Sequence, residues 1–320
     1  MSTSSCQADW GGAESIIFDP SNPAFAHFDT TKNCYGVHSP SFLKSADGTK
    51  LHMFFLVKYR FSAPGQTCPG GCTKDFGPCR YENRIYRSEI SLSGYYDPAN
   101  WSTPVWVGNG QVGYNVINNA RAIRLSNGMI ALAIAISPTI NRFNCATNFR
   151  SYVSFSSDEG LTWDNTQEIE TTIGVCRNQT FERGFMEPEI VEITHNGAQK
   201  ILIVMRTATT SPYYNRIPIN NLLGNWELPF LTPFPDATSN PNFPLVASNS
   251  PVSIERIPCT GHLLMILNES TNDRDRDKLR TMISTDEGQT WGQLKSLRFA
   301  TTPLLGHSYA SITMYQDEGW

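Results

Sequence analysis

The chain has 320 residues, of which 40% are hydrophobic and 17% charged, and its formal net charge is −4 at pH 7. This length can bury a substantial core, and the slightly acidic balance provides no basic surface field for a polyanion such as DNA. The longest apolar run, residues 129–136, is far shorter than the roughly 20 residues that span a bilayer. We therefore expect no nucleic-acid partner and no membrane span.

Features that bear on the cellular compartment conflict. The first residues, MSTSSCQADWGG, lack a charged segment followed by an apolar one, so no secretory signal is visible. Eight cysteines, a low charged fraction and N-x-S/T sequons at Asn100, Asn178 and Asn268 are typical of extracellular proteins. We expect a secreted or extracellular protein whose N-terminus is incomplete in this sequence, with a cytoplasmic location as the alternative.

Taken in chain order, residues 39–55, 119–136, 188–205 and 251–267 each read as a β-hairpin, with two apolar runs around a glycine-containing turn. Between the first two hairpins, Cys68, Cys72 and Cys79 lie in the stretch TCPGGCTKDFGPC. Their spacing matches neither a zinc site nor a redox CxxC pair. We expect a loop closed by a disulfide there, with reduced cysteines as the alternative, and no metal or cofactor.

A longer repeat connects these hairpins. Residues 156–163 and 284–291 both fit the pattern S-x-D-x-G-x-T-W, and we call them the repeat turns. In such a turn Asp accepts backbone N–H bonds, Gly supplies a permissive backbone and Trp packs between layers, so we expect these aspartates to be structural and not catalytic. The chain also spaces its tryptophans by 62, 63 and 65 residues, at Trp101, Trp163, Trp226 and Trp291.

This spacing indicates a unit of about 63 residues and predicts an all-β propeller. Two hairpins per unit give four antiparallel strands, and radial repetition of four-stranded sheets is a β-propeller, here expected to have six blades. The alternative, a β-sandwich with accidentally similar turns, does not explain the spacing of the tryptophans. We expect one propeller domain over residues 1–320. The sequence stops just after Gly319, the fifth hairpin glycine, so we expect the last blade or so to be missing.

Equivalent positions in the repeat indicate where a site could form. Counting back ten residues from each hairpin glycine leads to His38, Asn118, Glu187, Pro251 and Tyr309. If each hairpin begins with the innermost strand, these residues face one another at the mouth of a central channel. Different residue types at equivalent positions favour a functional site, with variable, solvated strand starts as the alternative.

The repeat turns resemble the Asp boxes (BNR repeats) of sialidases, or neuraminidases, and the resemblance extends over essentially the whole chain. In that family a tyrosine nucleophile is paired with a glutamate, three arginines hold the substrate carboxylate and an aspartate is the acid/base. Glu187 resembles the glutamate, and Arg206, nineteen residues later, resembles one of the arginines. Arg276 resembles a second arginine, and Tyr309 lies where the nucleophile is expected.

The chain departs from the family in two places. The R-I-P segment of the family corresponds to H-S-P at residues 38–40, so His38 replaces one arginine, and Arg60 is a candidate for a further cation. For the acid/base, Asp75 in the cysteine-rich stretch is the best-placed candidate. Further candidates for substrate contacts at the rim are Asn118 and Arg121.

The chemistry accounts for these residue types. Guanidinium groups bind a planar carboxylate well, and a neutral phenol activated by a glutamate avoids the repulsion between a carboxylate nucleophile and an acidic sugar. The resemblance therefore implies a retaining exo-glycosidase that removes sialic acid or a related acidic sugar from glycans. A polysaccharide lyase that uses Tyr and His around a uronate carboxylate, and a non-catalytic glycan-binding propeller, are the alternatives.

Overall fold

The structure is a computed structural model of the chain. It describes residues 34–62, 79–93, 100–107, 114–116, 122–137, 150–168, 186–206, 213–218, 250–269, 278–299 and 312. The regular elements named in these ranges are all β-strands, as the sequence predicts.

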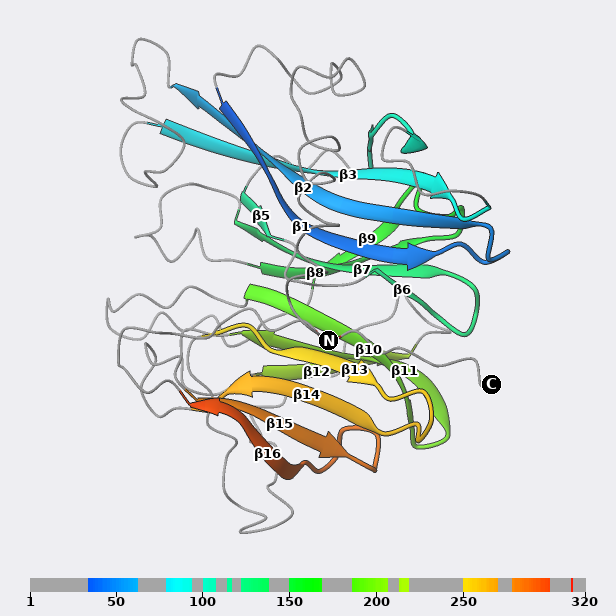
Figure 1. The fold of residues 1–320 in the computed structure, drawn as a ribbon, viewed down its shortest axis with the longest axis vertical. Helices are drawn as coiled ribbons and strands as arrows, with labels where there is room; N and C mark the ends of the chain where they lie inside the picture. Colours follow the sequence, from blue (N-terminus) through cyan, green and yellow to red (C-terminus); the bar gives the residue numbers. More distant parts are fainter. Residues whose placement is uncertain are drawn as a thin grey trace, which may run out of the picture.

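The strands form four antiparallel sheets that follow one another in chain order (Figure 1). The first sheet contains β1 (Cys34–Lys44), β2 (Lys50–Ser62), β3 (Cys79–Ser91) and β4 (Val105–Trp106). The second contains β5 (Tyr114–Val116), β6 (Ile123–Arg124), β7 (Ile130–Ser137), β8 (Arg150–Ser156) and β9 (Asp164–Glu168). The third contains β10 (Met186–His195), β11 (Ala198–Arg206) and β12 (Tyr213–Pro218). The fourth contains β13 (Ser253–Arg256), β14 (Leu263–Asn268), β15 (Lys278–Ser284) and β16 (Gly292–Phe299).

All four predicted hairpins are present, as β1–β2, β6–β7, β10–β11 and β13–β14. Their turns differ in length. The β10–β11 turn is the two-residue Asn196-Gly197, with φ values of 52° and 74°, which suits a type I′ turn. The β1–β2 turn is longer, since β1 ends at Lys44 and β2 begins at Lys50. Within it, Ser45 N–H donates to the carbonyl of Lys50. In the second sheet, β5 and β6 pair with opposite ends of β7.

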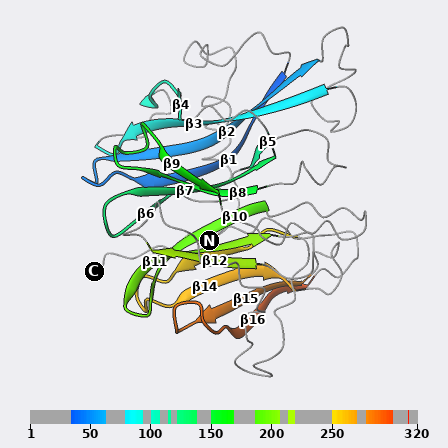
Figure 2. The ribbon, with the colours of Figure 1, turned by 180° about the vertical axis from the view of Figure 1, so that it is seen from behind.

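The alternation of side chains along the strands explains how the sheets stack. In β7, Ile130, Leu132 and Ile134 pack in the core shared with the first sheet, whereas Ala131 and Ala133 pack in the core shared with the third. Because successive side chains on a strand point to opposite faces, an apolar run such as IALAIAI suits a sheet buried on both sides. The views from the front and from behind both show the sheets as successive layers (Figure 2).

The two repeat turns connect β8 to β9 and β15 to β16. In the first, Asp158 Oδ1 accepts hydrogen bonds from the N–H groups of Leu161 and Thr162 at 3.1 and 2.8 Å. The Oγ of Ser156 accepts the N–H of Gly160 at 2.8 Å. The second turn repeats this pattern with Asp286, Thr290, Ser284 and Gly288. These aspartates hold the turns, as we predicted.

Three of the four spaced tryptophans occupy the same place in their sheets. Trp101 lies between β3 and β4, Trp163 between β8 and β9, and Trp291 between β15 and β16. Trp163 meets Phe54 of the preceding sheet edge to face, with ring centroids 5.7 Å apart. Trp291 is fully buried in the core between the third and fourth sheets. Trp226 lies outside the described residues.

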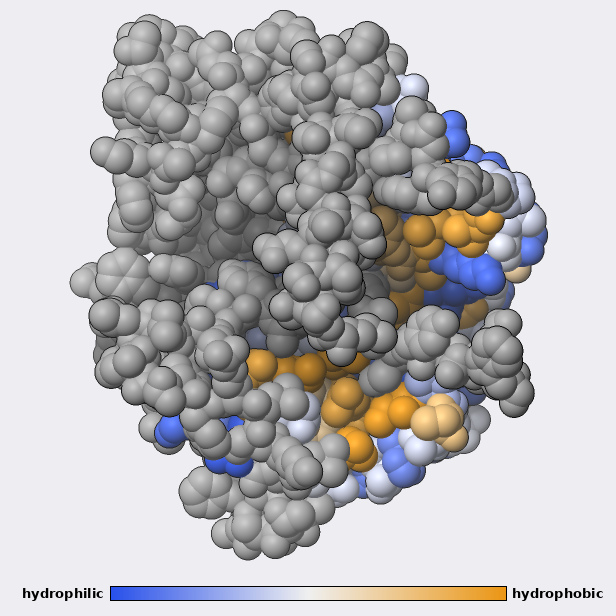
Figure 3. All heavy atoms as spheres, in the orientation of Figure 1, coloured by the Kyte–Doolittle hydropathy of each residue, from blue (hydrophilic) through white to orange (hydrophobic). Residues whose placement is uncertain are grey.

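Within the described residues the first and fourth sheets have four strands and the third has three. The succession of meandering sheets agrees with the predicted propeller, whereas six blades and a closed ring stay predictions. Apolar side chains also reach the surface, since Phe42, Val105 and Trp106 are between 43% and 48% exposed. Figure 3 shows hydrophobic residues in orange on the face that it draws.

Candidate active site

Glu187 and Arg206 form a buried ion pair at one end of the third sheet. Glu187 is near the start of β10 and Arg206 is the last residue of β11, so both lie far from the β10–β11 turn. Arg206 Nη1 donates to Glu187 Oε2 at 2.5 Å, and the side chains are only 7% and 9% exposed. A guanidinium and a carboxylate paired with little water give a strong, well-oriented contact.

A β-bulge places Glu187 in this pair. Met186 pairs with Arg206 and Glu189 with Val204, so Glu187 and Pro188 together lie outside the regular ladder. Glu187 has a φ of 45°, an uncommon conformation for a residue with a side chain, and the following proline restricts it further. Bulges and left-handed residues are frequent at functional sites, where they redirect a side chain.

The same motif occurs in the first sheet, where Ser39 has a φ of 53° and precedes Pro40 at a bulge in β1. The two bulges are offset, however. The residue that lies against a repeat-turn glycine serves as the reference point: Phe54 in the first sheet and Leu202 in the third. In the first sheet the regular ladder resumes opposite Phe54 itself. In the third sheet it resumes opposite Val204, two residues after Leu202.

Counting from the hairpin glycines was therefore wrong as a way to find equivalent positions. Gly197 directly precedes β11, whereas Gly48 precedes β2 by two residues, because the turns differ in length. His38 lies in the ladder opposite Leu56, while Glu187 lies on its bulge. His38 and Glu187 are consequently not equivalent.

The structure brings together two of the predicted site residues, Glu187 and Arg206. For His38 in β1 and Arg60 in β2 it describes the backbone alone, and Arg60 pairs with Cys34 at the same end of the first sheet as His38. Five predicted residues lie outside the described residues: Asp75, Asn118, Arg121, Arg276 and Tyr309. Their places in the site stay predictions. Cys68 and Cys72 also lie outside the description, which covers the backbone alone at Cys79.

An arginine–glutamate clamp beside each repeat turn was missed from the sequence. Arg124 binds both carboxylate oxygens of Glu159, at 3.0 and 2.8 Å, and also donates to the carbonyl of Lys44 in the first sheet. Arg256 binds Glu287 in the same bidentate way, at 2.9 and 2.7 Å, and donates to the carbonyl of Glu192 in the third sheet. The signal was present, because both repeat turns have Glu directly after Asp.

The electrostatics of the repeat turns agree with a structural role. Burial tends to raise the pKa of Asp158 and Asp286, but hydrogen bonds from Thr162 and Thr290 and the nearby serines outweigh it and leave each pKa below its usual value. A group held as an ionised hydrogen-bond acceptor is poorly suited to donate a proton in catalysis.

The sequence of residues 81–319 matches the model of a family described as the BNR repeat-like domain. The chain belongs to this family. A sequence comparison of this BNR repeat-like chain with curated proteins finds no match.

Solved structures similar to this BNR repeat-like domain include sialidases and another glycoside hydrolase. A Hadza microbial sialidase is 14% identical with a TM-score of 0.51, and the match covers 80% of this chain and 44% of that one. Trypanosoma rangeli sialidase is 16% identical with a TM-score of 0.52, and the match covers 85% of this chain and 40% of that one. A family 117 glycoside hydrolase from the marine bacterium Zobellia galactanivorans is 10% identical with a TM-score of 0.51, and the match covers 86% of this chain and 74% of that one.

At these identities the likeness concerns the fold alone, which this chain shares with the sialidases and the family 117 glycoside hydrolase. The BNR repeat-like chain spans less than half of the two sialidases named here. Because the repeat turns and the stacked sheets are features of the fold, they carry no information about substrate. The Glu187–Arg206 pair at the opposite end of the third sheet is the feature that bears on chemistry.

One of the three sequons, at Asn268, is buried in the described structure. The side chain of Asn268, in one of the three sequons, is only 2% exposed, and its Nδ2 donates to Ser250 Oγ at 3.2 Å. A glycan on this nitrogen would displace a buried hydrogen bond, so this sequon offers no accessible acceptor in the folded domain. Asn100 is exposed, and Asn178 lies outside the described residues. The described part of the chain contains no apolar helix of the length that a membrane span requires.

Proposed function

We propose that this BNR repeat-like domain belongs to a retaining exo-glycosidase that removes sialic acid or a related acidic sugar from glycans. The observation that carries the proposal is the buried Glu187–Arg206 pair, held by a left-handed bulge within a sialidase-type fold. A buried charged pair next to a strained backbone is more costly to keep than an apolar contact, which favours a functional reason for it.

In the proposed reaction the phenol oxygen of Tyr309 attacks the anomeric carbon while Glu187 accepts the phenolic proton. Asp75 donates a proton to the departing glycosidic oxygen. Water then attacks the same carbon, Asp75 takes a proton from this water, and Glu187 returns its proton to the phenolate. Two displacements at one carbon retain its configuration.

The cations have a separate task. Arg206, Arg276 and Arg60, together with His38, are proposed to bind the substrate carboxylate, and Asn118 and Arg121 to contact the sugar at the rim. Arg206 also orients Glu187 through the 2.5 Å contact, so that it serves both the base and the substrate. We also propose that the repeat turns are Asp boxes and that the complete ring has six blades.

The proposal is tested with a sialoside that carries a fluorescent leaving group. Wild type should release the fluorophore, and Glu187→Gln should lower kcat by at least about a hundredfold, because the amide cannot accept the phenolic proton. Glu192→Gln, which removes the same charge from the same strand, is the matched control and should retain activity.

Two outcomes would replace the proposal. Release of unsaturated uronate products from acidic polysaccharides, measured by ultraviolet absorbance, would identify a lyase. Binding of sialylated glycans by wild type without any turnover would identify a non-catalytic glycan-binding propeller.

A further inference from the structure

The fourth sheet has its own arginine–glutamate pair, at the same end of the sheets as Glu187 and Arg206 in the third. Arg280 on β15 contacts Glu269, the residue that follows β14, with its Nε 2.5 Å from Glu269 Oε2. β14 runs toward this end from the β13–β14 turn, and β15 starts from it. We call the end of the sheets opposite the hairpin turns the site end.

The side chain of Arg280 lies on the face of the fourth sheet that is turned toward the third. Arg280 pairs with Leu267, which belongs to the apolar core shared by these two sheets. Met282, two residues further along β15, belongs to the same core. Residues opposite each other on neighbouring strands share a face, and so do residues two apart on one strand. Arg280 therefore takes a position where an apolar residue would enlarge the core.

Arg280 and Arg206 lie at the same height between the third and fourth sheets. A Cβ on Gly288, in the second repeat turn, would lie 2.8 Å from the side chain of Leu202 and 3.6 Å from that of Leu263, which gives a common reference level. Arg206 comes four residues after Leu202, and the residue paired with Arg280 comes four residues after Leu263. At roughly 3.3 Å per residue, both arginines are about 13 Å from this level, on sheets that face each other about 10 Å apart. The two side chains consequently border one space.

The pair in the fourth sheet is the more accessible of the two. The side chains of Arg280 and Glu269 are 23% and 37% exposed, whereas those of Arg206 and Glu187 are 7% and 9% exposed. A ligand that enters from solvent at the site end therefore meets the fourth sheet's pair before it reaches the buried pair of the third sheet.

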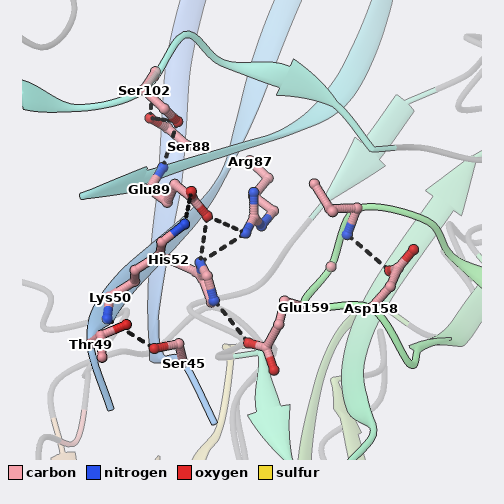
Figure 4. Close-up of polar contacts among 12 residues, drawn as sticks. Ser45, Thr49, Lys50, His52, Arg87, Ser88, Glu89, Ser102, Asp158 and Glu159 are labelled. Carbon is pink, nitrogen blue, oxygen red and sulfur yellow. Dashed lines mark hydrogen bonds and ion pairs between the residues drawn. The ribbon is translucent and has the colours of Figure 1, made fainter. Parts of the chain in front are cut away.

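Other charged groups between the sheets connect one sheet to the next. Figure 4 shows such a group at the turn end, where His52 of the first sheet is 2.9 Å from Glu159 in the repeat turn of the second. Arg87, on the strand beside His52, lies 3.0 Å from the other ring nitrogen. The two clamps likewise donate to a carbonyl of the neighbouring sheet. These groups have a clear part in holding the stacked sheets together.

The contact between Arg280 and Glu269 stays within one sheet. The ladder already joins β14 to β15, and it continues to the N–H of Glu269, which donates to the carbonyl of Lys278 at 2.9 Å. An ion pair this exposed adds little stability. Opposite the step from Leu279 to Arg280, β16 has one extra residue, which is a β-bulge, and bulges are frequent next to active sites. The stability of the fold therefore gives little reason for a charged pair at this position.

We propose that Glu269 and Arg280 form a subsite for hydroxyl groups of the substrate sugar, beside Glu187 and Arg206; this inference rests on the proposed function. A carboxylate only accepts hydrogen bonds, so Glu269 binds a hydroxyl as the donor. A guanidinium only donates, so Arg280 binds the oxygen of a neighbouring hydroxyl, and its contact with Glu269 uses one of its five N–H groups. Because the two charges cancel, the pair suits hydroxyls and adds no net charge for the substrate carboxylate.

The test is the KM of a fluorogenic sialoside and of analogues that each lack one hydroxyl. Arg280→Gln and Glu269→Gln should each raise KM for the complete sialoside by about tenfold or more, and raise KM more than they lower kcat, because a charged hydrogen bond to the bound sugar is lost. For the analogue without the bound hydroxyl, wild type and variant should have equal KM values, since the contact is already absent. Glu287→Gln removes a clamp carboxylate from the same sheet at the turn end and should keep the wild-type KM.

Unchanged KM in both variants, or a rise that is the same for every analogue, would overturn the subsite while leaving the proposed activity in place. Glu269 is the more exposed member of the pair, so Glu269→Gln provides the test even if Arg280→Gln does not fold.

The subsite can also be tested if wild type releases no fluorophore, a result that would reject the proposed activity. Titration calorimetry then measures the affinity for N-acetylneuraminic acid and its deoxy analogues. Weaker binding by both variants, with the loss confined to sugars that carry one particular hydroxyl, would support the subsite without the activity. Equal affinity in wild type and variants, or no binding by wild type, would overturn it.

Discussion

The two repeat turns share the hydrogen bonds of their Ser, Asp and Thr side chains but meet different surfaces. In both, Ser and Asp close the turn, Glu precedes the left-handed Gly, and an arginine clamps the Glu. The first turn meets an aromatic ring and a histidine, Phe54 and His52, whereas the second meets an aliphatic side chain and a backbone N–H. The repeated sequence thus determines the turn, and the facing sheet determines what the turn contributes to stability.

The largest expected difference concerns the tryptophans that end the two turns. Trp291 is fully buried, so Trp291→Ala should destabilise the fold by about 3–5 kcal/mol. Trp163 is partly exposed and should cost only about 1–3 kcal/mol when replaced by Ala, including its edge-to-face contact with Phe54. Urea denaturation of both variants measures this difference, and equal losses would contradict it.

The glycines of the two turns should also differ. A Cβ on Gly160 would lie 2.7 Å from the ring of Phe54, and one on Gly288 would lie 2.8 Å from a methyl group of Leu202. A buried aromatic ring adjusts less easily than the end of a leucine, so Gly160→Ala should cost about 2–4 kcal/mol and Gly288→Ala about 1–3 kcal/mol.

Gly197→Ala is the control for these two variants. Gly197 has a similar φ of 74° with nothing within 4 Å of its Cβ position, so the variant should show the backbone cost alone, about 1 kcal/mol. The comparison fails if Gly197→Ala is as destabilising as Gly160→Ala.

Replacing the clamped glutamates should have a smaller effect. Glu159 and Glu287 are 35% and 28% exposed, which reduces the value of their ion pairs, so Glu→Gln should cost about 1 kcal/mol or less at either position. Within this limit, Glu159→Gln should lower the free energy of unfolding more than Glu287→Gln, because it also weakens the contact with His52. Burial raises the pKa of each glutamate, but its arginine outweighs this effect and leaves the pKa below 4.5. The differences from wild type should therefore shrink as the pH falls below about 4.5, which thermal melts in acid would check.

The smallest effect is expected in the β1–β2 turn. Hydrogen bonds from Ser45 and Thr49 lower the pKa of Asp47 to about 2. The contribution of the Asp47 carboxylate to stability is present above pH 3.8 and is lost as the pH falls toward 2. Between pH 5 and pH 2.5 the melting temperature of wild type should therefore fall slightly more than that of Asp47→Asn. An unchanged difference between the two proteins over this range would exclude the effect.

The sequence predicted correctly those features that depend on residues close to one another in the chain. The hairpins and repeat turns follow from alternating apolar residues and from turn residues such as Asn196-Gly197, whose conformational needs are visible one residue at a time. The clamps and the surroundings of His52 were not predicted, because their partners come from different sheets. Glu159, for example, lies 107 residues from His52.

The candidate site was predicted to a similar extent. The family resemblance identified Glu187 and Arg206, and the structure shows that their side chains are in contact. Their roles in a site stay predictions. The bulge that brings them together was not predicted, since a left-handed glutamate before a proline contradicts its own local preference. The glycine count failed for a related reason, because it assumed that all turns have one length.

The most direct test of the account is the turnover of a fluorogenic sialoside by Tyr309→Phe. Phenylalanine keeps the ring, so a structural tyrosine would lose only its hydroxyl contact, about 0.5–1.5 kcal/mol of stability. A nucleophile loses its reacting atom. We expect kcat to fall by about three orders of magnitude or more without a change in melting temperature, and the addition of Glu187→Gln to lower it little further, because the two residues act as a unit. If Tyr309→Phe folds normally and hydrolyses the sialoside at nearly the wild-type rate, the proposed catalytic pair is wrong and the chain shares only its fold with sialidases.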